Sequence, residues 1–401
     1  MTLSFTKNNN QWDGNGAAKM SEGGKDQIIV PFIVQTTCIF WIVTKLICWR
    51  LWTIERLLPT APPFDFLEAP AAVHLVLLAA SLLLMFFLVL KPGNKLLLVA
   101  LLISEVLSCL LDQSRWQPWE YQFIFIVLIN IINHRQPQKI VPGIGFLMVS
   151  TYAYSGLGKF SPSFLALFWD NMLLKQYLNI DPAVIHNNYV HYSGYMLAFI
   201  ELLFGIGLFF RATQKFAAWA IIVMHLLIVI MVGPFGLRYN ISVWPWNIMM
   251  MIHLYILFIY RKTLAIDLPT LWKGWNKIII ICWGILPMLN HTVGWWDNAL
   301  SSRLFAGNHY HMNLCVKDST EIKQLRPFLY SSKRNAICDS GTLMVNLQSW
   351  GLAEMRSPVY TEVRAYKKIA KKWISNHKGT STKAVVFLNV RGGGVKIVPE
   401  E

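Results

Sequence analysis

Long apolar runs alternate with short polar connections along most of the chain. An apolar segment of about 20 residues can cross the hydrocarbon core of a bilayer, and only helices satisfy their own backbone groups there. Because several runs reach or approach that length, the pattern predicts an all-α polytopic membrane bundle with about nine transmembrane helices. The predicted segments are residues 28–49, 71–90, 96–111, 119–133, 140–157, 193–210, 216–233, 241–260 and 278–295.

Composition supports the same class. The 401 residues are 55% hydrophobic and only 14% charged, which is typical of a multi-span membrane protein. The net charge of +15 comes mainly from short loops and the carboxyl-terminal tail, so membrane topology accounts for it and no nucleic-acid partner is predicted. Basic residues in alternate loops favour a cytoplasmic amino terminus and an extracytoplasmic carboxyl terminus. The predicted inner loops contain Lys91, Lys95, Arg135, Lys139, Arg211, Lys215, Arg261, Lys262, Lys273 and Lys277.

Three polar or mixed segments complete the predicted organisation. Residues 1–27 lack an apolar run and are expected to form a disordered cytoplasmic tail. Residues 161–192 form a long apolar connection, read either as an interfacial or re-entrant helical lid or as a peripheral amphipathic helix. Residues 297–401 alternate like strands at 310–317, 343–349 and 384–391 and have helical spacing at 361–377. They predict a small α+β extracytoplasmic domain.

Cysteines are few and lack the spacing of a metal site, so no metal is predicted. Cys315 and Cys338 both fall in the predicted outer domain, where the compartment permits a disulfide. The sequence leaves two alternatives open, a Cys315–Cys338 bond or two free thiols.

Lys159 is the first candidate for chemistry, because it ends an apolar segment directly after Gly156 and Gly158. A desolvated lysine has a lowered pKa and can act as a general base. The alternative is a lysine that extends from the end of a span to the membrane interface.

Other polar residues fall inside predicted spans, where they are costly and usually face one another or a cavity. Glu201 and His225 are candidates to tune Lys159, and Glu201 could pair with either residue. The alternative is that these groups only make buried structural hydrogen bonds. The remaining polar residues within spans are Glu105, Asn247, His253, Asn290 and His291.

Two aromatic regions are candidate substrate-binding elements. In residues 111–121, polar side chains suit an ion-pair network and the aromatic rings suit the membrane interface. In residues 233–247, a proline near the start of the eighth span and flat aromatic rings suit either a pocket for a planar ring or a helix kink without a ligand. The candidate residues are Asp112, Arg115, Trp116, Trp119, Tyr121, Trp244, Trp246 and Asn247.

The segment Tyr154–Phe160 resembles the end of a span in the membrane domain of vitamin K-dependent gamma-carboxylases and their bacterial relatives, the HTTM family. A second resemblance lies at Leu111, Asp112, Ser114, Trp116 and Tyr121, and a looser one at His225-Leu226 and Pro245-Trp246. The resemblance to this family extends from about residue 32 to residue 303. The resemblance implies a quinol as lipophilic substrate or cofactor, Lys159 as the base that starts quinol oxidation, and a bacterial inner-membrane location.

The chain departs from that family at one informative place. Where the carboxylase has Asn-Asn-His, this sequence has Gln117-Pro118-Trp119, and its outer region is much shorter. Peptide glutamate carboxylation is therefore not expected. Glu201 with Gly205 and Gly207 is weakly similar to a pattern in DoxX/MauE-like small membrane proteins.

These observations give two functional hypotheses. In the first, the chain is a quinol-dependent oxidoreductase or modifying enzyme, with Lys159, Glu201 and His225 as catalytic residues. In the second, it is a non-catalytic subunit that binds quinone or assembles with a redox or secretion complex through its basic outer domain. A transporter is least favoured, because no paired broken helices or repeated halves appear.

Overall fold

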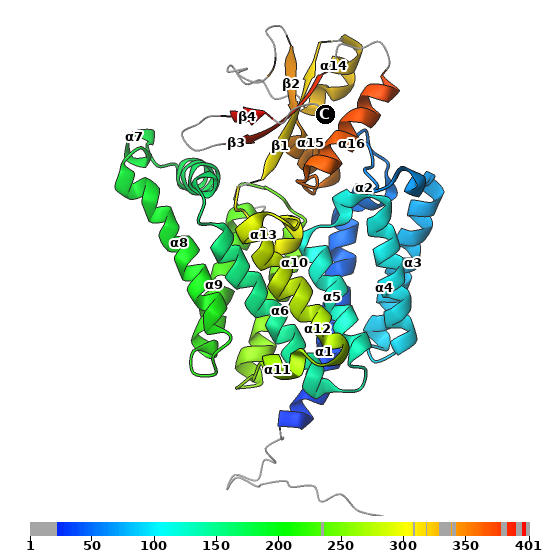
Figure 1. Cartoon of the computed structure of the whole chain (residues 1–401), viewed down its shortest axis with the longest axis vertical. Helices are drawn as coiled ribbons and strands as arrows, with labels where there is room; N and C mark the ends of the chain where they lie inside the picture. Colours follow the sequence, from blue (N-terminus) through cyan, green and yellow to red (C-terminus); the bar gives the residue numbers. More distant parts are fainter. Residues whose placement is uncertain are drawn as a thin grey trace, which may run out of the picture.

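A helical bundle carries a small α+β domain at one end (Figure 1). The computed structural model describes residues 22–233, 236–307, 309–317, 319–328, 338, 342–377, 383–389 and 395–397. Most of the predicted amino-terminal tail, residues 1–21, lies outside these. The first helix begins at Glu22, before the predicted start at residue 28.

Helices occupy all nine predicted apolar segments. Six described helices are long and apolar enough to cross a membrane, which confirms a multi-pass membrane type of chain. They are α1 (Glu22–Ile47), α3 (Ala71–Leu90), α6 (Pro137–Gly158), α8 (Asn188–Gly207), α9 (Gln214–Val232) and α10 (Val243–Leu254) with its π-helical continuation η4 (Tyr255–Tyr260). The shorter ones are α2 (Trp49–Thr53), α4 (Lys95–Leu111), α5 (Pro118–Ile132), α11 (Leu268–Leu271) and the continuous run α12 (Lys277–Ile280), η6 (Ile281–Ile285) and α13 (Leu286–Val293).

Local sequence explains several helix boundaries. The side chain of Asn94 accepts hydrogen bonds from the backbone N–H groups of Leu96 and Leu97 and so caps α4. Pro118 and Pro137 occupy the first positions of α5 and α6, where a missing N–H leaves no hydrogen bond unmade. The segment that precedes Lys159 is therefore the carboxyl-terminal end of one helix, α6.

Glycines bring α6 and α8 into backbone contact. A Cβ at Gly156 would overlap the backbone of Leu202, and a Cβ at Gly205 would lie 2.5 Å from the backbone nitrogen of Ala153. Small residues allow this close approach between helices in a membrane, where apolar burial alone does not drive association.

Substituting Gly156→Ala is expected to destabilise the bundle by about 1–3 kcal/mol, because the new methyl group must push α8 away. The matched control is Gly284→Ala in η6, where the nearest atom is the flexible side-chain Cζ of Phe146 at 3.4 Å. Unfolding of both variants in mixed micelles of dodecyl maltoside and SDS measures the difference. Equal stability of the two variants would contradict the close contact between α6 and α8.

The connection between α6 and α8 is helical. The π-helix η3 (Phe164–Tyr177) and the short α7 (Pro182–Ile185) occupy it. In Figure 1, η3 is seen nearly end-on while α8 runs down the view, so η3 lies across the direction of the bundle helices. Its buried side chains Phe164, Leu165 and Phe168 face the protein. Residues 161–192 therefore contain a helix, as predicted, and this helix lies against the end of the bundle.

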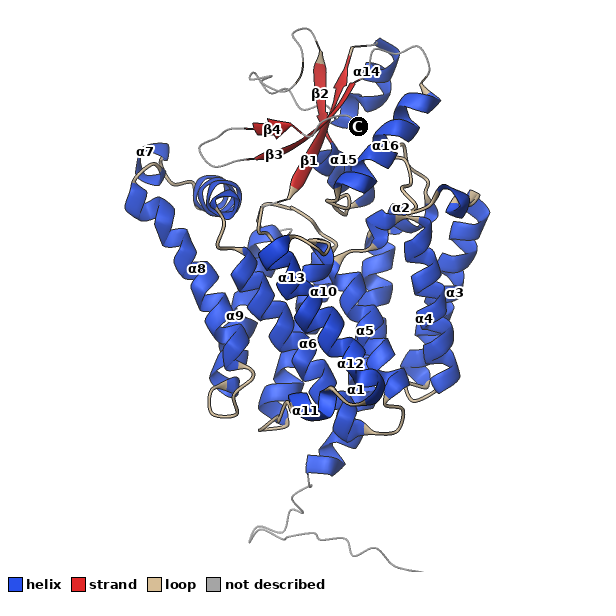
Figure 2. Cartoon of the chain, in the orientation of Figure 1, coloured by secondary structure: helices blue, strands red, loops and turns tan. Residues whose placement is uncertain are grey.

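The carboxyl-terminal domain is a four-stranded antiparallel sheet with helices (Figure 2). The strand order is β2-β1-β3-β4. Its elements are β1 (Tyr310–Val316), α14 (Ser319–Leu325), β2 (Leu343–Asn346), α15 (Leu347–Met355), α16 (Val363–Asn376), β3 (Lys383–Asn389) and β4 (Val395–Ile397). The strand predicted at 343–349 extends too far, because β2 ends at Asn346. The side chain of Asn346 accepts a hydrogen bond from Ser349 N at 3.0 Å and starts α15 there.

Cys315 and Cys338 are joined by a disulfide, with their Cα atoms 5.6 Å apart. The bond closes a loop across a sequence separation of 23. The described cysteines Cys38, Cys48, Cys109 and Cys282 are free thiols.

Removing this disulfide by Cys315→Ser with Cys338→Ser is expected to destabilise the outer domain by about 3 kcal/mol, because the unfolded chain regains loop entropy. Hydrogen exchange of β1 in the intact protein should become faster, whereas the membrane helices should keep their protection. Dithiothreitol should reproduce the effect in the native chain and add nothing in the double variant. Unchanged exchange in β1 would show that the bond contributes no stability.

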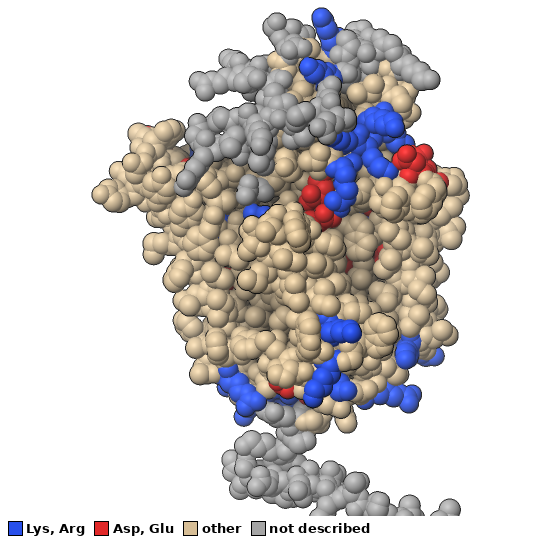
Figure 3. Space-filling model, in the orientation of Figure 1, with Lys and Arg blue, Asp and Glu red and all other residues tan. Residues whose placement is uncertain are grey.

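The carboxyl-terminal domain is attached to the loops at one end of the bundle. The Glu354 carboxylate accepts hydrogen bonds from Leu57 N at 2.5 Å and Leu58 N at 3.0 Å. On α16, Lys368 and Lys372 pair with Asp65 and Glu68 at 2.8 Å each. Part of the basic surface predicted to dock other proteins is therefore used within the chain. Figure 3 shows charged side chains at both ends of the molecule and a mostly uncharged band between them.

Candidate functional site

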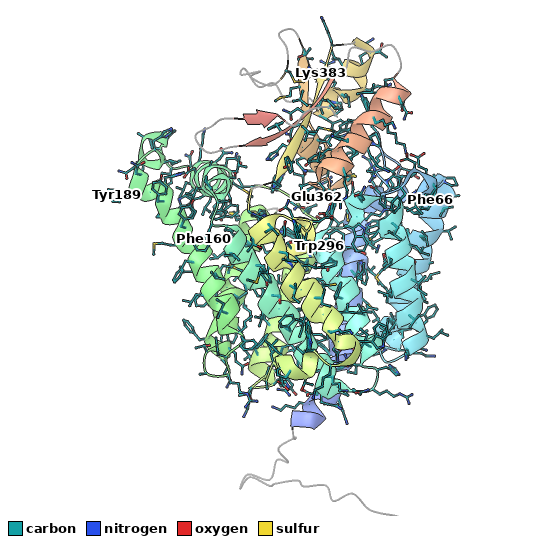
Figure 4. The ribbon with its side chains drawn as sticks, viewed as in Figure 1. Phe66, Phe160, Tyr189, Trp296, Glu362 and Lys383 are labelled. Atoms are coloured by element: carbon teal, nitrogen blue, oxygen red, sulfur yellow. A yellow bond between two sulfur atoms is a disulfide. The ribbon has the colours of Figure 1, made fainter. Side chains whose placement is uncertain are left out.

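Lys159 ends α6 and is buried against α8. Its Nζ donates hydrogen bonds to Glu201 Oε2 at 2.5 Å and to Ser155 Oγ at 2.7 Å. The side chains of Lys159 and Glu201 are only 7% and 5% exposed. Of the two predicted partners for Glu201, the structure therefore selects Lys159. Phe160, the next residue, is labelled in Figure 4 at the end of the bundle that faces the outer domain.

A second buried chain of hydrogen bonds lies along the same face of α6. Tyr152 OH and His225 Nε2 are 2.6 Å apart, and His225 Nδ1 lies 2.6 Å from Asn247 Oδ1. The amide of Asn247 donates to the backbone oxygen of Val243 at 2.6 Å. Because this amide donates through its nitrogen, its oxygen is an acceptor and His225 Nδ1 carries a proton. His225 Nε2 is then the acceptor for the Tyr152 hydroxyl.

These two groups form one polar region across four helices. Tyr152, Ser155 and Lys159 recur at helical spacing on α6, while Glu201, His225 and Asn247 come from α8, α9 and α10. Glu201 and Lys159 both interact electrostatically with His225. The contact between Lys159 and Glu201 can pass a proton from a lysine to a carboxylate without contact with bulk water. Sequence analysis named its three ionisable members but missed Tyr152 and Ser155.

Trp244 and Trp246, the predicted walls of a ring pocket, both contact protein groups. Trp246 Nε1 donates to Gln122 Oε1 at 2.6 Å, and Trp244 packs so closely on Gly233 that a Cβ there would overlap its indole ring. A cavity of about 420 Å³ lies elsewhere, among η3, α7 and the start of α8. The residues that line it include Asp170, Lys175, His186 and His191.

The loop after α4 is held by an ion pair and by backbone contacts. Asp112 pairs with Arg56, a partner that sequence analysis did not name. Burial raises the pKa of the Asp112 carboxyl, but the guanidinium groups of Arg56 and Arg115 outweigh it and hold that pKa below its usual value. The carboxylate also accepts from Ser114 N at 3.0 Å. Asp112 therefore fixes the conformation of this loop.

Arg115 is fully buried and contacts protein groups on every side. Its guanidinium donates to the backbone oxygens of Leu51, Ser108 and Trp52 at 2.9–3.1 Å. It also lies 2.8 Å from His74 Nδ1. This arrangement joins α2, α3 and α4, so Arg115 contacts protein where sequence analysis predicted a substrate contact.

The aromatic residues of the same loop pack into the bundle. Trp119 is 1% exposed and lies between Trp52 and Phe123. Tyr121 stacks on Trp283 with ring centroids 5.1 Å apart, and Trp116 meets Tyr121 edge-on at 6.4 Å. Trp119 and Tyr121 are therefore buried packing groups, while Trp116 is partly exposed at the edge of this cluster.

A buried ionic cluster on α1, α4 and α5 was incompletely predicted. Lys45 pairs with Glu105 at 2.8 Å, and its Nζ lies 3.0 Å from the centroid of the Trp52 ring. Glu120, which the sequence suggested as a member of an ion-pair network with Asp112 and Arg115, lies in the first turn of α5 and accepts from Trp41 Nε1 at 2.7 Å. The second carboxyl oxygens of Glu105 and Glu120 have no hydrogen-bond partner among the described residues. Lys45 thus pairs with Glu105, and the carboxyl group of Glu120 lies beside that of Glu105 in the same cluster.

Comparison of the chain with family models, with curated proteins and with solved structures finds no match.

Proposed function

We propose that this chain is a multi-pass inner-membrane protein whose nine helical segments cross the bilayer, with the amino terminus in the cytoplasm and the α+β domain on the opposite side. The uncharged band between two charged ends in Figure 3 supports this placement. The basic loop residues at the end remote from the outer domain agree with a cytoplasmic location of that end. The spans α4, α5 and α12–α13 are shorter than the other six.

We further propose that the protein removes a proton from a lipophilic hydroxyl compound, of which a reduced quinone is the class implied by the HTTM resemblance. The observation that carries this proposal is the buried polar region that joins Lys159 and Glu201 to His225. Ionisable groups at this depth are expensive and usually have a functional role. The chain would act as an oxidoreductase or modifying enzyme of the quinol.

The geometry indicates which role each residue would have in proton transfer. Transfer of the ammonium proton of Lys159 to Glu201, along the 2.5 Å contact between them, leaves a neutral amine. That amine can accept a proton from a substrate hydroxyl, since both atoms then lie in a water-poor site. The donors of Tyr152 and His225 are engaged with His225 and Asn247. These two residues would therefore act on the resulting charge through their electrostatic interaction with the Lys159–Glu201 pair. A bound quinol would supply the electron pair, and molecular oxygen or another acceptor would receive it.

A second candidate is the non-catalytic subunit that binds quinone or assembles with a redox or secretion complex. It is favoured by the two partners of the Lys159 ammonium, Ser155 and Glu201, which satisfy it without a substrate. In that case, the ion pair only locks α6 to α8.

The test uses the full chain purified in detergent and supplied with ubiquinol and menaquinol analogues. Native protein is expected to bind the quinol and oxidise it in the presence of oxygen, and Lys159→Ala to lose about 100-fold or more of the rate. Lys139→Ala, at the opposite end of α6, is the matched control and should keep the native rate. Binding without oxidation would favour the subunit, and absence of both would remove the quinol from the account.

A further inference from the structure

A buried group of one lysine and two carboxyl groups lies apart from the Lys159 region and has no role in the proposed function. It joins three helices, because Lys45 comes from α1, Glu105 from α4 and Glu120 from α5. Helix α5 packs against both α1 and α4 (Figure 1). Both glutamates are 0% exposed and the lysine is 1% exposed. Since bulk water does not reach these groups, protein atoms have to satisfy them.

One oxygen of each carboxyl group accepts a hydrogen bond from a nitrogen donor. Glu105 Oε2 accepts from Lys45 Nζ at 2.8 Å, and Glu120 Oε2 accepts from Trp41 Nε1 at 2.7 Å. The lysine ammonium also lies 3.0 Å from the centroid of the Trp52 ring. These donors therefore satisfy the two Oε2 atoms.

The second oxygen of each carboxyl group, Oε1, is inaccessible to solvent and has no hydrogen-bond partner among the described residues when both groups are ionised. The side chains of Glu105 and Glu120 are nevertheless within hydrogen-bonding reach of one another. A carboxylate only accepts hydrogen bonds, whereas a protonated carboxyl group has an O–H that donates. A proton on one of the two glutamates would therefore satisfy both orphan oxygens.

The charges around the pair lead to the same requirement. Two carboxylates in contact away from water repel each other, and such pairs hold one proton in common. Lys45 balances one negative charge. Arg115 also acts on Glu105 and on Asp112, but its hydrogen bonds go to backbone oxygens, Ser108 Oγ and a histidine. The other titratable groups that face the cluster are thiols, which are largely neutral at pH 7: Cys38, Cys48 and Cys109.

We propose that Glu105 and Glu120 form a proton-binding site inside the bundle, with one proton held between their Oε1 atoms. The ligand is the proton itself, and it needs no cavity because it occupies the contact between two oxygens. With the proton bound, the pair carries one negative charge, which Lys45 balances. Loss of the proton would leave two carboxylates in contact, so its binding favours the packing of α4 against α5.

Infrared spectroscopy of the full chain in detergent at pH 7 detects this proton. The C=O stretch of a protonated carboxyl group is separate from the bands of carboxylates and of the backbone, and isotopic labelling of glutamate with heavy carbon assigns it to that residue type. Native protein is expected to show the band. Glu120→Gln should lose the intensity of one carboxyl group, because Glu105 then pairs with Lys45 and accepts from the new amide.

Glu105→Gln distinguishes a shared proton from a proton that burial alone keeps on Glu120. In this variant, Glu120 accepts from the new amide and from Trp41, and Lys45 balances its charge, so the same intensity should again be lost. Glutamine keeps the shape of glutamate, and both variants are therefore expected to fold. Retention of the full band in Glu105→Gln would overturn the proposal, as would absence of the band from native protein.

Two controls complete the test. Glu68→Gln makes the same change at a side chain that is 55% exposed and should leave the band as in native protein. Lys159→Ala should also leave it unchanged, because Lys159 ends α6 and contacts α8. The proton site is thus tested independently of the proposed quinol oxidation. Loss of the band in Glu68→Gln would place the proton on that surface residue and contradict the proposal.

Discussion

Replacing Lys45 by methionine is expected to destabilise the folded protein by about 3–5 kcal/mol, because Glu105 then loses its buried cation. Both carboxyl groups are 0% exposed and each has an oxygen without a hydrogen-bond partner among the described residues. Methionine keeps most of the volume of the lysine side chain, so lost packing contributes little. Unfolding in mixed micelles of dodecyl maltoside and SDS measures the change.

A second substitution separates charge from packing in this cluster. Lys45→Met with Glu105→Gln removes the charge left behind and should recover at least half of the lost stability. The comparison Lys139→Met changes a partly exposed basic residue near the start of α6 and should cost less than about 1 kcal/mol. If the double variant were no more stable than Lys45→Met, the attribution to an unpaired carboxylate would be wrong.

Replacing Lys159 by methionine is the second change with a large expected effect, and it should act on stability and activity together. Glu201 would be left buried without its cation, at a cost of about 3–5 kcal/mol. Quinol oxidation, the activity proposed for this site, should fall by about 100-fold or more. The two effects have different origins and can be separated.

The double variant Lys159→Met with Glu201→Gln provides that separation. Removing both charges should restore most of the stability, because no unpaired group remains buried. It should not restore quinol oxidation, since the base is still absent. Recovery of both properties would mean that the pair only holds α6 to α8, and the non-catalytic subunit would then be the better description.

Hydrophobic patterning predicted where the helices lie but could not predict which side chains meet. All nine apolar segments contain helices, because backbone satisfaction and apolar length are local properties of the sequence. The pairing of Glu201 with Lys159 was one of two alternatives. It depends on the close approach of α6 and α8 at Gly156 and Gly205, which is a property of the assembled bundle.

Lys45 and Glu120 show why part of the ionic network was missed. Lys45 lies near the end of the first apolar segment, where a lysine usually marks topology, and Glu120, near the start of the predicted segment 119–133, was grouped with Asp112 and Arg115. Proline at the first position of α5 instead starts the helix one residue before Trp119 and turns Glu120 into the interior. The sequence signal available was an acidic residue directly after a helix-starting proline.

The interpretation of the aromatic regions was limited for a related reason. A flat ring beside a proline is compatible with a ligand pocket or with packing, and only tertiary contacts distinguish them. The indole N–H of Trp246 donates a hydrogen bond to Gln122, and the ring of Trp244 packs on Gly233. The cavity near η3 could not be predicted, because it depends on how that helix lies across the bundle.

Chemical rescue of Lys159→Ala tests the central claim most directly, namely that Lys159 is the proton acceptor. Small primary amines added to the purified variant should enter the space of the missing side chain and restore quinol oxidation. The rate should rise with the pKa of the amine, as expected for general-base catalysis. If the variant still binds quinol but no amine restores its rate, or if Lys159→Ala keeps the native rate, Lys159 is not the base.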